Sequence, residues 1–255
     1  MASSGSRWRY FRNRSRWWWF SRSTATAVCL FVFYLFAVWP PPLWYRFYFP
    51  RETAFMAMRR DQDPARAEKR KYDPVPLTKI SRSMQRAVLV AEDHRFYEHG
   101  GFDWIEFRKA LGYRRDSFDL ASARDRRDLW RGIRRTDWSD VRGASTITQQ
   151  LAKNLYLSPS RNPLRKVKEA VTTVRLEIAL PKARILELYL NTAELGDEIW
   201  GVEAASRAYF GRSAARLTNF QAASLAGTLP HPRSSNPNYK PGRMAWRRNL
   251  ILGRM

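Results

Sequence analysis

Two short polar segments carry most of the side chains in this chain that could take part in chemistry. In the first, residues 91–101, Glu92 and Asp93 follow directly on an apolar run at 87–91. A carboxylate beside an apolar wall has a raised pKa and can act as a general acid or base. The second, residues 143–154, combines small hydroxyl residues, two adjacent amides and a lysine, a set suited to binding a sugar or a phosphate. Together these segments predict an enzyme that acts on a phosphate-bearing carbohydrate.

The pair Glu92 and Asp93 also has a simpler interpretation, because such pairs often end a solvated helix. The residues that follow favour a functional role. Phe96 and His99 come next, and glycines at 100–101 would let the backbone approach a ligand closely.

A second candidate carboxylate, Glu169, stands in a basic stretch. Arg165 lies four residues earlier on the same face of a predicted helix, and this spacing alone indicates a structural ion pair. The surrounding cations form either a solvated helix surface or a grip that would neutralise a diphosphate. These cations are Lys153, Arg161, Arg165, Lys166 and Lys168. Glu187 lies among apolar residues and is assigned a structural role.

The pattern excludes several other kinds of site. The three histidines, His94, His99 and His231, lack zinc-protease spacing, and the single Cys29 forms neither a thiolate cluster nor an intramolecular disulfide. The chain contains no nucleophile elbow, no phosphate-binding loop and no Ser-x-x-Lys acylation motif.

Helices are predicted to position the two polar segments. Apolar residues at spacings of three and four predict a helix over 80–91 and a long helical block over 163–191, broken once by a proline. Alanine-rich segments at 201–209 and 220–229 add two more helices. Because no run of alternating strands is present, we expect a mainly α domain. Residues 113–141, where Arg and Asp alternate, are predicted to form a solvated, partly helical insertion.

The N-terminal region is predicted to be a membrane anchor. Residues 24–45 are 22 uncharged residues, close to the roughly 20 that span a bilayer as a helix. Six arginines precede this segment and aromatic residues flank it, which places the N-terminus in the cytoplasm. A cleavable signal peptide is disfavoured, since prolines at 40–42 follow the apolar core instead of a small-x-small cleavage site. The predicted order is a cytoplasmic basic tail (1–23), the transmembrane anchor (24–45) and a polar tether (46–79).

The formal net charge of +23 favours an anionic partner. Nucleic acid, an anionic membrane surface and a phosphorylated substrate all fit such a charge; a generally arginine-rich composition explains it without any ligand. The predicted topology puts the domain outside the cytoplasm, which disfavours nucleic acid.

Five segments, in order, resemble the glycosyltransferase family 51 domain. They are residues 92–101, 143–154, 165–169, 184–191 and 201–211. With the N-terminal anchor, the ordered set is highly specific; it resembles the monofunctional members of the family most, and the resemblance covers about residues 80–255. It implies a mainly α, lysozyme-like fold. The insertion at 113–141 is longer and more charged than is usual in this family.

The resemblance also implies a reaction, the joining of lipid II into glycan strands with inversion at the anomeric carbon. Glu92 would be the general base that takes the proton from the acceptor's 4-hydroxyl. Glu169 would be a second catalytic carboxylate that assists departure of undecaprenyl diphosphate, which reverses its assignment as structural. The substrate-binding residues that the resemblance implies are Asp93, Phe96, His99, Gly143, Ser145, Thr146, Gln149, Gln150, Lys153, Asn154, Arg161, Arg165 and Lys166.

No cofactor is firmly implied, since Asp93 could either help to hold a divalent cation, Mg²⁺ or Mn²⁺, or only orient Glu92. The implied partners are lipid II, the nascent glycan strand, membrane lipids and cell-wall synthesis proteins such as transpeptidases, with no nucleic acid. The implied location is the bacterial inner membrane, crossed once, with the catalytic domain in the periplasm. Two alternatives stay open: a membrane-anchored lysozyme-like lytic enzyme, against which the basic cluster speaks, and an inactive cell-wall scaffold.

Overall fold

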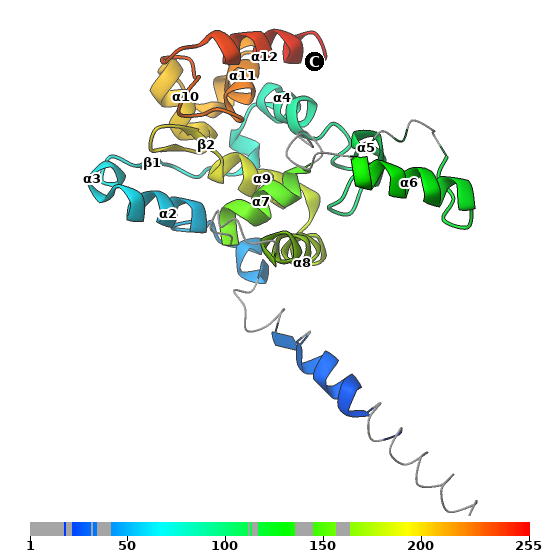
Figure 1. The fold of residues 1–255 in the computed structure, drawn as a ribbon. Helices are drawn as coiled ribbons and strands as arrows, with labels where there is room; N and C mark the ends of the chain where they lie inside the picture. The colour runs from blue at the N-terminus through cyan, green and yellow to red at the C-terminus, as the bar shows by residue number, and fades with distance from the viewer. Residues whose placement is uncertain are drawn as a thin grey trace, which may run out of the picture. The chain divides into compact units, whose positions relative to one another are not determined.

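A computed structural model of the chain describes residues 18, 22–31, 33, 34, 42–111, 113, 117–135, 145–156 and 164–255 (Figure 1). The chain divides into two compact units, residues 1–45 and residues 46–255. In the first unit, residues 22–31 are helical. Among the residues listed above, no helix is both long enough and apolar enough to cross a bilayer.

The second unit consists mainly of helices, which confirms the prediction of a mainly α domain. Its α-helices are α2 (Ala54–Gln62), α3 (Pro64–Ala67), α4 (Arg82–Glu92), α5 (Trp104–Ala110), α6 (Ala123–Arg135), α7 (Ile147–Tyr156), α8 (Leu164–Ala179), α9 (Lys182–Thr192), α10 (Val202–Phe210), α11 (Asn219–Thr228) and α12 (Gly242–Leu252). Short 3₁₀ turns are η2 (Pro42–Arg46), which spans the boundary between the units, η3 (Leu77–Lys79) and η4 (Ala214–Arg216).

The core is centred on α7 and α9. Helix α9 is buried along most of its length, with Ile185, Leu186 and Leu188 fully enclosed. Helix α7 packs against α9 and also against α8 and α2, and the four lie close together in Figure 1. On the other side of the unit, α11 packs against both α4 and α12. The two polar segments of the sequence therefore adjoin α4 and α7, two helices that pack against the core.

The helix boundaries follow local signals in the sequence. Helix α4 begins after Ser81, whose hydroxyl accepts a hydrogen bond from the Met84 amide at 3.2 Å. Pro181 separates α8 from α9, as predicted, and is the N-cap of α9. Helix α11 begins with a capping box formed by Thr218 and Gln221.

A small three-stranded sheet was not predicted. Its order is β1 (Lys71–Tyr72), β3 (Ile199–Trp200), β2 (Glu194–Gly196), with β1 parallel and β2 antiparallel to β3. Strands of two or three residues are too short to show an alternating pattern, so periodicity could not have revealed them.

Residues 46–79, which the sequence pattern assigns to a tether, fold with the rest of the second unit. Helix α2 packs on α7, and Met56 within it is completely buried. Strand β1 joins the sheet, and the Tyr72 hydroxyl donates to the Pro50 carbonyl oxygen at 2.8 Å. The prolines that suggested a linker instead delimit elements; Pro64, for example, begins α3.

The insertion predicted over 113–141 contains α6, in line with a partly helical segment. Residues 114–116 and 136–141 of it lie outside the part of the chain that the structure describes.

Two glycines beside α10 allow a direct test of this fold. Gly201 has φ 79° and ψ 159°, a region that is essentially limited to glycine, and a Cβ there would lie 2.4 Å from the Asn191 carbonyl oxygen. Gly211 has φ 65°, with no atom within 4 Å of a Cβ. We expect Gly201→Ala to lower the free energy of unfolding by about 3 kcal/mol or more, and Gly211→Ala by only about 1–2 kcal/mol. Urea denaturation in detergent measures both; equal losses would contradict the close packing at Gly201.

Candidate active site

The carboxylate of Glu92 is the centre of the site. It belongs to the last residue of α4, whose buried face includes Met84, Ala87 and Val88. The side chain is 13% exposed. Its Oε1 lies 2.6 Å from Nη2 of Arg247 on α12, and its Oε2 accepts a hydrogen bond from Gln150 Nε2 on α7 at 2.9 Å. Three helices that are distant in sequence therefore meet at this carboxylate.

Burial raises the pKa of Glu92 above its usual range. The charge of Arg247 and the hydrogen bonds from Gln150 and Arg247 oppose this effect, as does the charge of Lys153. Burial is the largest contribution, so the carboxylate is more basic than a free glutamate while its ionised form keeps two partners. This is the electrostatic state expected of a general base.

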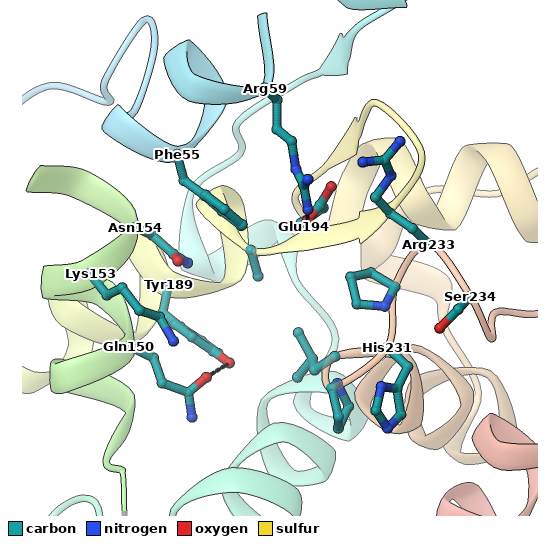
Figure 2. Close-up of a pocket in the computed structure, with 14 residues that line it drawn as sticks. Phe55, Arg59, Gln150, Lys153, Asn154, Tyr189, Glu194, His231, Arg233 and Ser234 are labelled. Carbon is teal, nitrogen blue, oxygen red and sulfur yellow. Dashed lines mark hydrogen bonds and ion pairs between the residues drawn. The ribbon is translucent and has the colours of Figure 1, made fainter. Parts of the chain in front are cut away.

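The amide of Gln150 is oriented by Tyr189 on α9. The tyrosine hydroxyl donates to Gln150 Oε1 at 2.8 Å, as Figure 2 shows, so that Nε2 is the atom turned toward Glu92. Burial, with Glu92 nearby, raises the pKa of Tyr189 well above its usual value. The hydroxyl therefore keeps its proton and remains a donor.

Asp93, the C-cap of α4, connects that helix to the start of α7. Its Oδ2 accepts a hydrogen bond from the Ile147 amide at 3.0 Å, and its Oδ1 lies 3.0 Å from His99 Nε2. His99 Nδ1 accepts from the Gly101 amide at 3.2 Å, so the proton of the ring is on Nε2 and is donated to Asp93.

Thr146 and Gln149 complete the N-terminus of α7. The Gln149 side chain accepts from the Thr146 amide at 2.9 Å, and the Thr146 hydroxyl accepts from the Gln149 amide at 3.2 Å. This reciprocal pair is a capping box. The Thr146 hydroxyl also donates to the Gly101 carbonyl at 2.7 Å. Both side chains, predicted to bind substrate, are thus engaged in holding α7.

The fit of a divalent cation can be judged from the donor atoms. Asp93, His99 and Asp103 each place one potential ligand atom within 4.8 Å of the others. However, His99 Nε2 carries a proton and cannot bind a metal in this arrangement, and Asp103 Oδ1 accepts from the amides of Ile105 and Glu106. Asp93 and His99 are thus engaged in hydrogen bonds with each other and with backbone amides, whereas Asp103 Oδ2 lies 3.8 Å from Arg95 Nε, its one ion-pair partner within the described residues. We assign no step to a cation.

A cavity of about 530 Å³ opens beside Gln150. From α7 it is lined by Gln150, Lys153 and Asn154, three residues predicted to bind substrate. Figure 2 shows these side chains facing the cavity from one side, with Arg233 and His231 on the opposite side and Arg59 entering from the top of the view. Amides, a lysine and the phenol of Tyr189 near Glu92 make this cavity suitable for a saccharide joined to an anion.

A second cavity of about 150 Å³ is lined by Glu92 itself. Asp93, Ser145 and Thr146 also line it, together with Arg254. Glu92 thus faces the smaller cavity and reaches the larger one through Gln150.

The remaining predicted residues are placed less directly. Phe96 is fully buried, with the Lys182 ammonium 4.4 Å from its ring centre, and it packs in the interior instead of lining either cavity. Glu169 is buried on α8, where its Oε1 lies 2.8 Å from Lys166 Nζ, and it also lines neither cavity. Gly143 and Arg161 lie outside the described residues, as does the side chain of Arg165.

Sequence reasoning missed Arg247 and treated Tyr189 only as part of an apolar stripe. Arg247 lies 155 residues from Glu92 along the chain, and nothing in its local sequence distinguishes it from the neighbouring arginines. For Tyr189 a usable signal existed, because a tyrosine buried in a helix needs a partner for its hydroxyl.

The comparison with known proteins agrees with this geometry. The family model described as transglycosylase matches residues 60–255. A biosynthetic peptidoglycan transglycosylase of Thiobacillus denitrificans is 40% identical over 94% of this chain and 96% of its own. One from Bordetella pertussis is 41% identical over 93% of each chain, and one from Chromobacterium violaceum is 39% identical over 91% of this chain and 93% of its own. The chain therefore belongs to the transglycosylase family.

Proposed function

We propose that Glu92 is the general base with which this chain polymerises lipid II into glycan strands. The enzyme is a peptidoglycan glycosyltransferase. The observation that carries the assignment of Glu92 is its buried carboxylate, which lines the smaller cavity and is held between Arg247 and Gln150, a residue that lines the larger one.

In the proposed reaction, Glu92 takes the proton from the 4-hydroxyl of the acceptor sugar. The hydroxyl oxygen forms a bond to the anomeric carbon of the donor, and the bond from that carbon to the diphosphate oxygen breaks. Attack from the face opposite the leaving group inverts the anomeric centre. Undecaprenyl diphosphate leaves with the electron pair of the broken bond. We assign the acceptor hydroxyl to the smaller cavity, which Glu92 lines, and the donor to the larger one.

Cations supply most of the help that the leaving group needs, because a departing diphosphate requires charge neutralisation more than a strong acid. Lys153 lines the larger cavity. We assign Arg161, Arg165 and Lys166 to the same task, with Glu169 as the second carboxylate, held by Lys166.

We further propose that residues 24–45 anchor the chain in the bacterial inner membrane, with residues 1–23 in the cytoplasm and the catalytic unit in the periplasm. Support comes from the uncharged segment between an arginine-rich tail and flanking aromatic residues. Anchoring would raise the effective concentration of a lipid-borne substrate at the site. Because the product strands carry peptides, we expect separate transpeptidases to act on them.

Replacement of Glu92 by Gln tests the general base. Glu92→Gln keeps the shape of the side chain but replaces one acceptor oxygen by an NH2 donor and cannot accept the proton, so we expect polymerisation of labelled lipid II to fall by about 10²–10⁴-fold. Glu98→Gln, at an exposed position in the same segment, is the matched control and should keep wild-type activity. An active, folded Glu92→Gln variant would overturn the assignment. Release of fragments from finished cell wall by the wild type would instead indicate a lytic enzyme.

The pH dependence tests the role of Arg247. The base must be ionised, so kcat/KM should rise with pH as Glu92 loses its proton, and burial places this rise above the usual range of a glutamate. Arg247→Gln removes a charge that lowers the pKa of Glu92. The rise should therefore move to higher pH, while Arg247→Lys should move it less. A loss of activity that is equal at every pH would indicate a structural role only.

The proposed catalytic role of Glu169 can be tested by comparison with Glu187, a carboxylate to which we assign a structural role. Glu169→Gln should lower kcat by about tenfold or more, because it removes the carboxylate that holds Lys166, a cation assigned to the leaving group, without moving the rise in activity with pH. Glu187, which accepts from the Leu77 amide, is the control: Glu187→Gln should lower the thermal stability and leave kcat of the folded enzyme near wild type. The same behaviour from both variants would assign Glu169 to structure.

A further inference from the structure

The insertion in this chain forms a defined helical pair. Helix α6 lies against the C-terminal end of α5, since a Cβ at Gly132 would come within 2.4 Å of the Leu111 carbonyl oxygen. Figure 1 shows the two helices together, away from the sheet of the second unit. This close approach identifies the face of α6 that is turned inward.

The residues on the inward face of α6 recur at the spacing of an α-helix. Asp125 lies seven residues before Gly132, is 8% exposed and accepts a hydrogen bond from the Asp119 amide at 3.0 Å. Asp128 and Leu129, between them in sequence, are half-buried. These four positions follow an i, i+3, i+4, i+7 pattern and form one stripe.

The opposite face of α6 carries a basic stripe with one tryptophan. Its members are Arg124, Arg127, Trp130, Arg131 and Arg134, and all are exposed. Trp130 is 61% exposed. Arg131 pairs with Asp128 at 3.0 Å, whereas the other three arginines form no ion pair within the described residues. We call this face the α6 basic stripe.

The chemistry of the α6 basic stripe limits its partner. A single tryptophan gives too little apolar surface to dock in a hydrophobic groove, and no acidic residue of α6 shares this face. Guanidinium groups bind phosphate through two parallel hydrogen bonds. Tryptophan favours the boundary between lipid headgroups and acyl chains. Phosphates together with such a boundary are found on the surface of an anionic phospholipid bilayer.

We propose that the α6 basic stripe docks the insertion on anionic phospholipid headgroups. This inference rests on one part of the proposed function: an enzyme whose substrate is carried by a lipid works at the surface of a bilayer. Each cation near an anionic surface adds to the attraction, and its contribution falls away within a Debye length. The insertion would thus add a second, salt-sensitive contact with the membrane to that of the anchor.

The test follows α6 in the full-length chain. Cys29 is the only native cysteine, so a Cys29→Ser, Ala123→Cys chain carries a single thiol beside the stripe for an environment-sensitive dye. The chain is placed in nanodiscs of phosphatidylcholine alone or mixed with phosphatidylglycerol. We expect about twofold or greater protection of the dye from acrylamide quenching in the anionic discs only, and loss of this protection at high salt.

Two controls separate the stripe from the rest of the protein. Replacing Arg124, Arg127, Arg131 and Arg134 together by Gln should abolish the lipid-dependent protection, while a dye at Trp246→Cys, exposed on α12, should not sense the lipid. Polymerisation of lipid II in detergent should be unchanged by the four replacements, so failure of this proposal and failure of the proposed function give different results. Equal quenching in both kinds of disc, or protection that survives the four replacements, would overturn the proposal.

Discussion

The carboxylate of Asp93 connects the two segments on which the site depends. Asp93 is the C-cap of α4, where its backbone N–H donates to the Leu89 carbonyl oxygen, and its carboxylate accepts a hydrogen bond from the first amide of α7. Free amides at a helix N-terminus need acceptors, and an anion there is also favoured by the helix dipole. The same contact therefore stabilises α7 and sets its position relative to Glu92. Gln150, Lys153 and Asn154 reach the larger cavity because α7 begins at this point.

The proton affinity of Glu92 depends on a balance between burial and its partners. Burial alone would favour the neutral acid, which cannot act as a base. Arg247 and Gln150 stabilise the ionised form and so lower the pKa of Glu92. Because burial has the larger effect, the pKa remains above that of an exposed glutamate. Tyr189 takes part indirectly, because its hydroxyl decides which end of the Gln150 amide faces the carboxylate. The loss of Arg247, Gln150 or Tyr189 would therefore change the pKa of Glu92.

Local signals in the sequence predict much of the fold and the identity of the central carboxylate. The apolar spacing before Glu92 predicts α4, and Pro181 marks the break between α8 and α9. The same reasoning overlooked that Thr146-x-x-Gln149 is a capping box; the assignment of these two side chains to substrate binding stays a prediction of the family resemblance. Contacts between distant segments carry no local signal: the two-residue strands and Arg247 depend on tertiary packing, which periodicity cannot show.

The position of Arg247 illustrates how a remote packing contact can set the chemistry of the site. Helix α12 crosses α11 at Gly227, where a Cβ would lie 2.8 Å from the Met244 carbonyl oxygen and 3.2 Å from the Arg248 amide nitrogen. Only a residue without a side chain allows the two backbones to approach this closely. Arg247 lies one helical turn beyond Met244, and from there it donates to the Ala91 carbonyl at 3.1 Å as well as to Glu92. A larger residue at position 227 would move α12 outward and withdraw the positive charge from the base. Gly227 thus influences the pKa of the proposed base, Glu92, without lining either cavity.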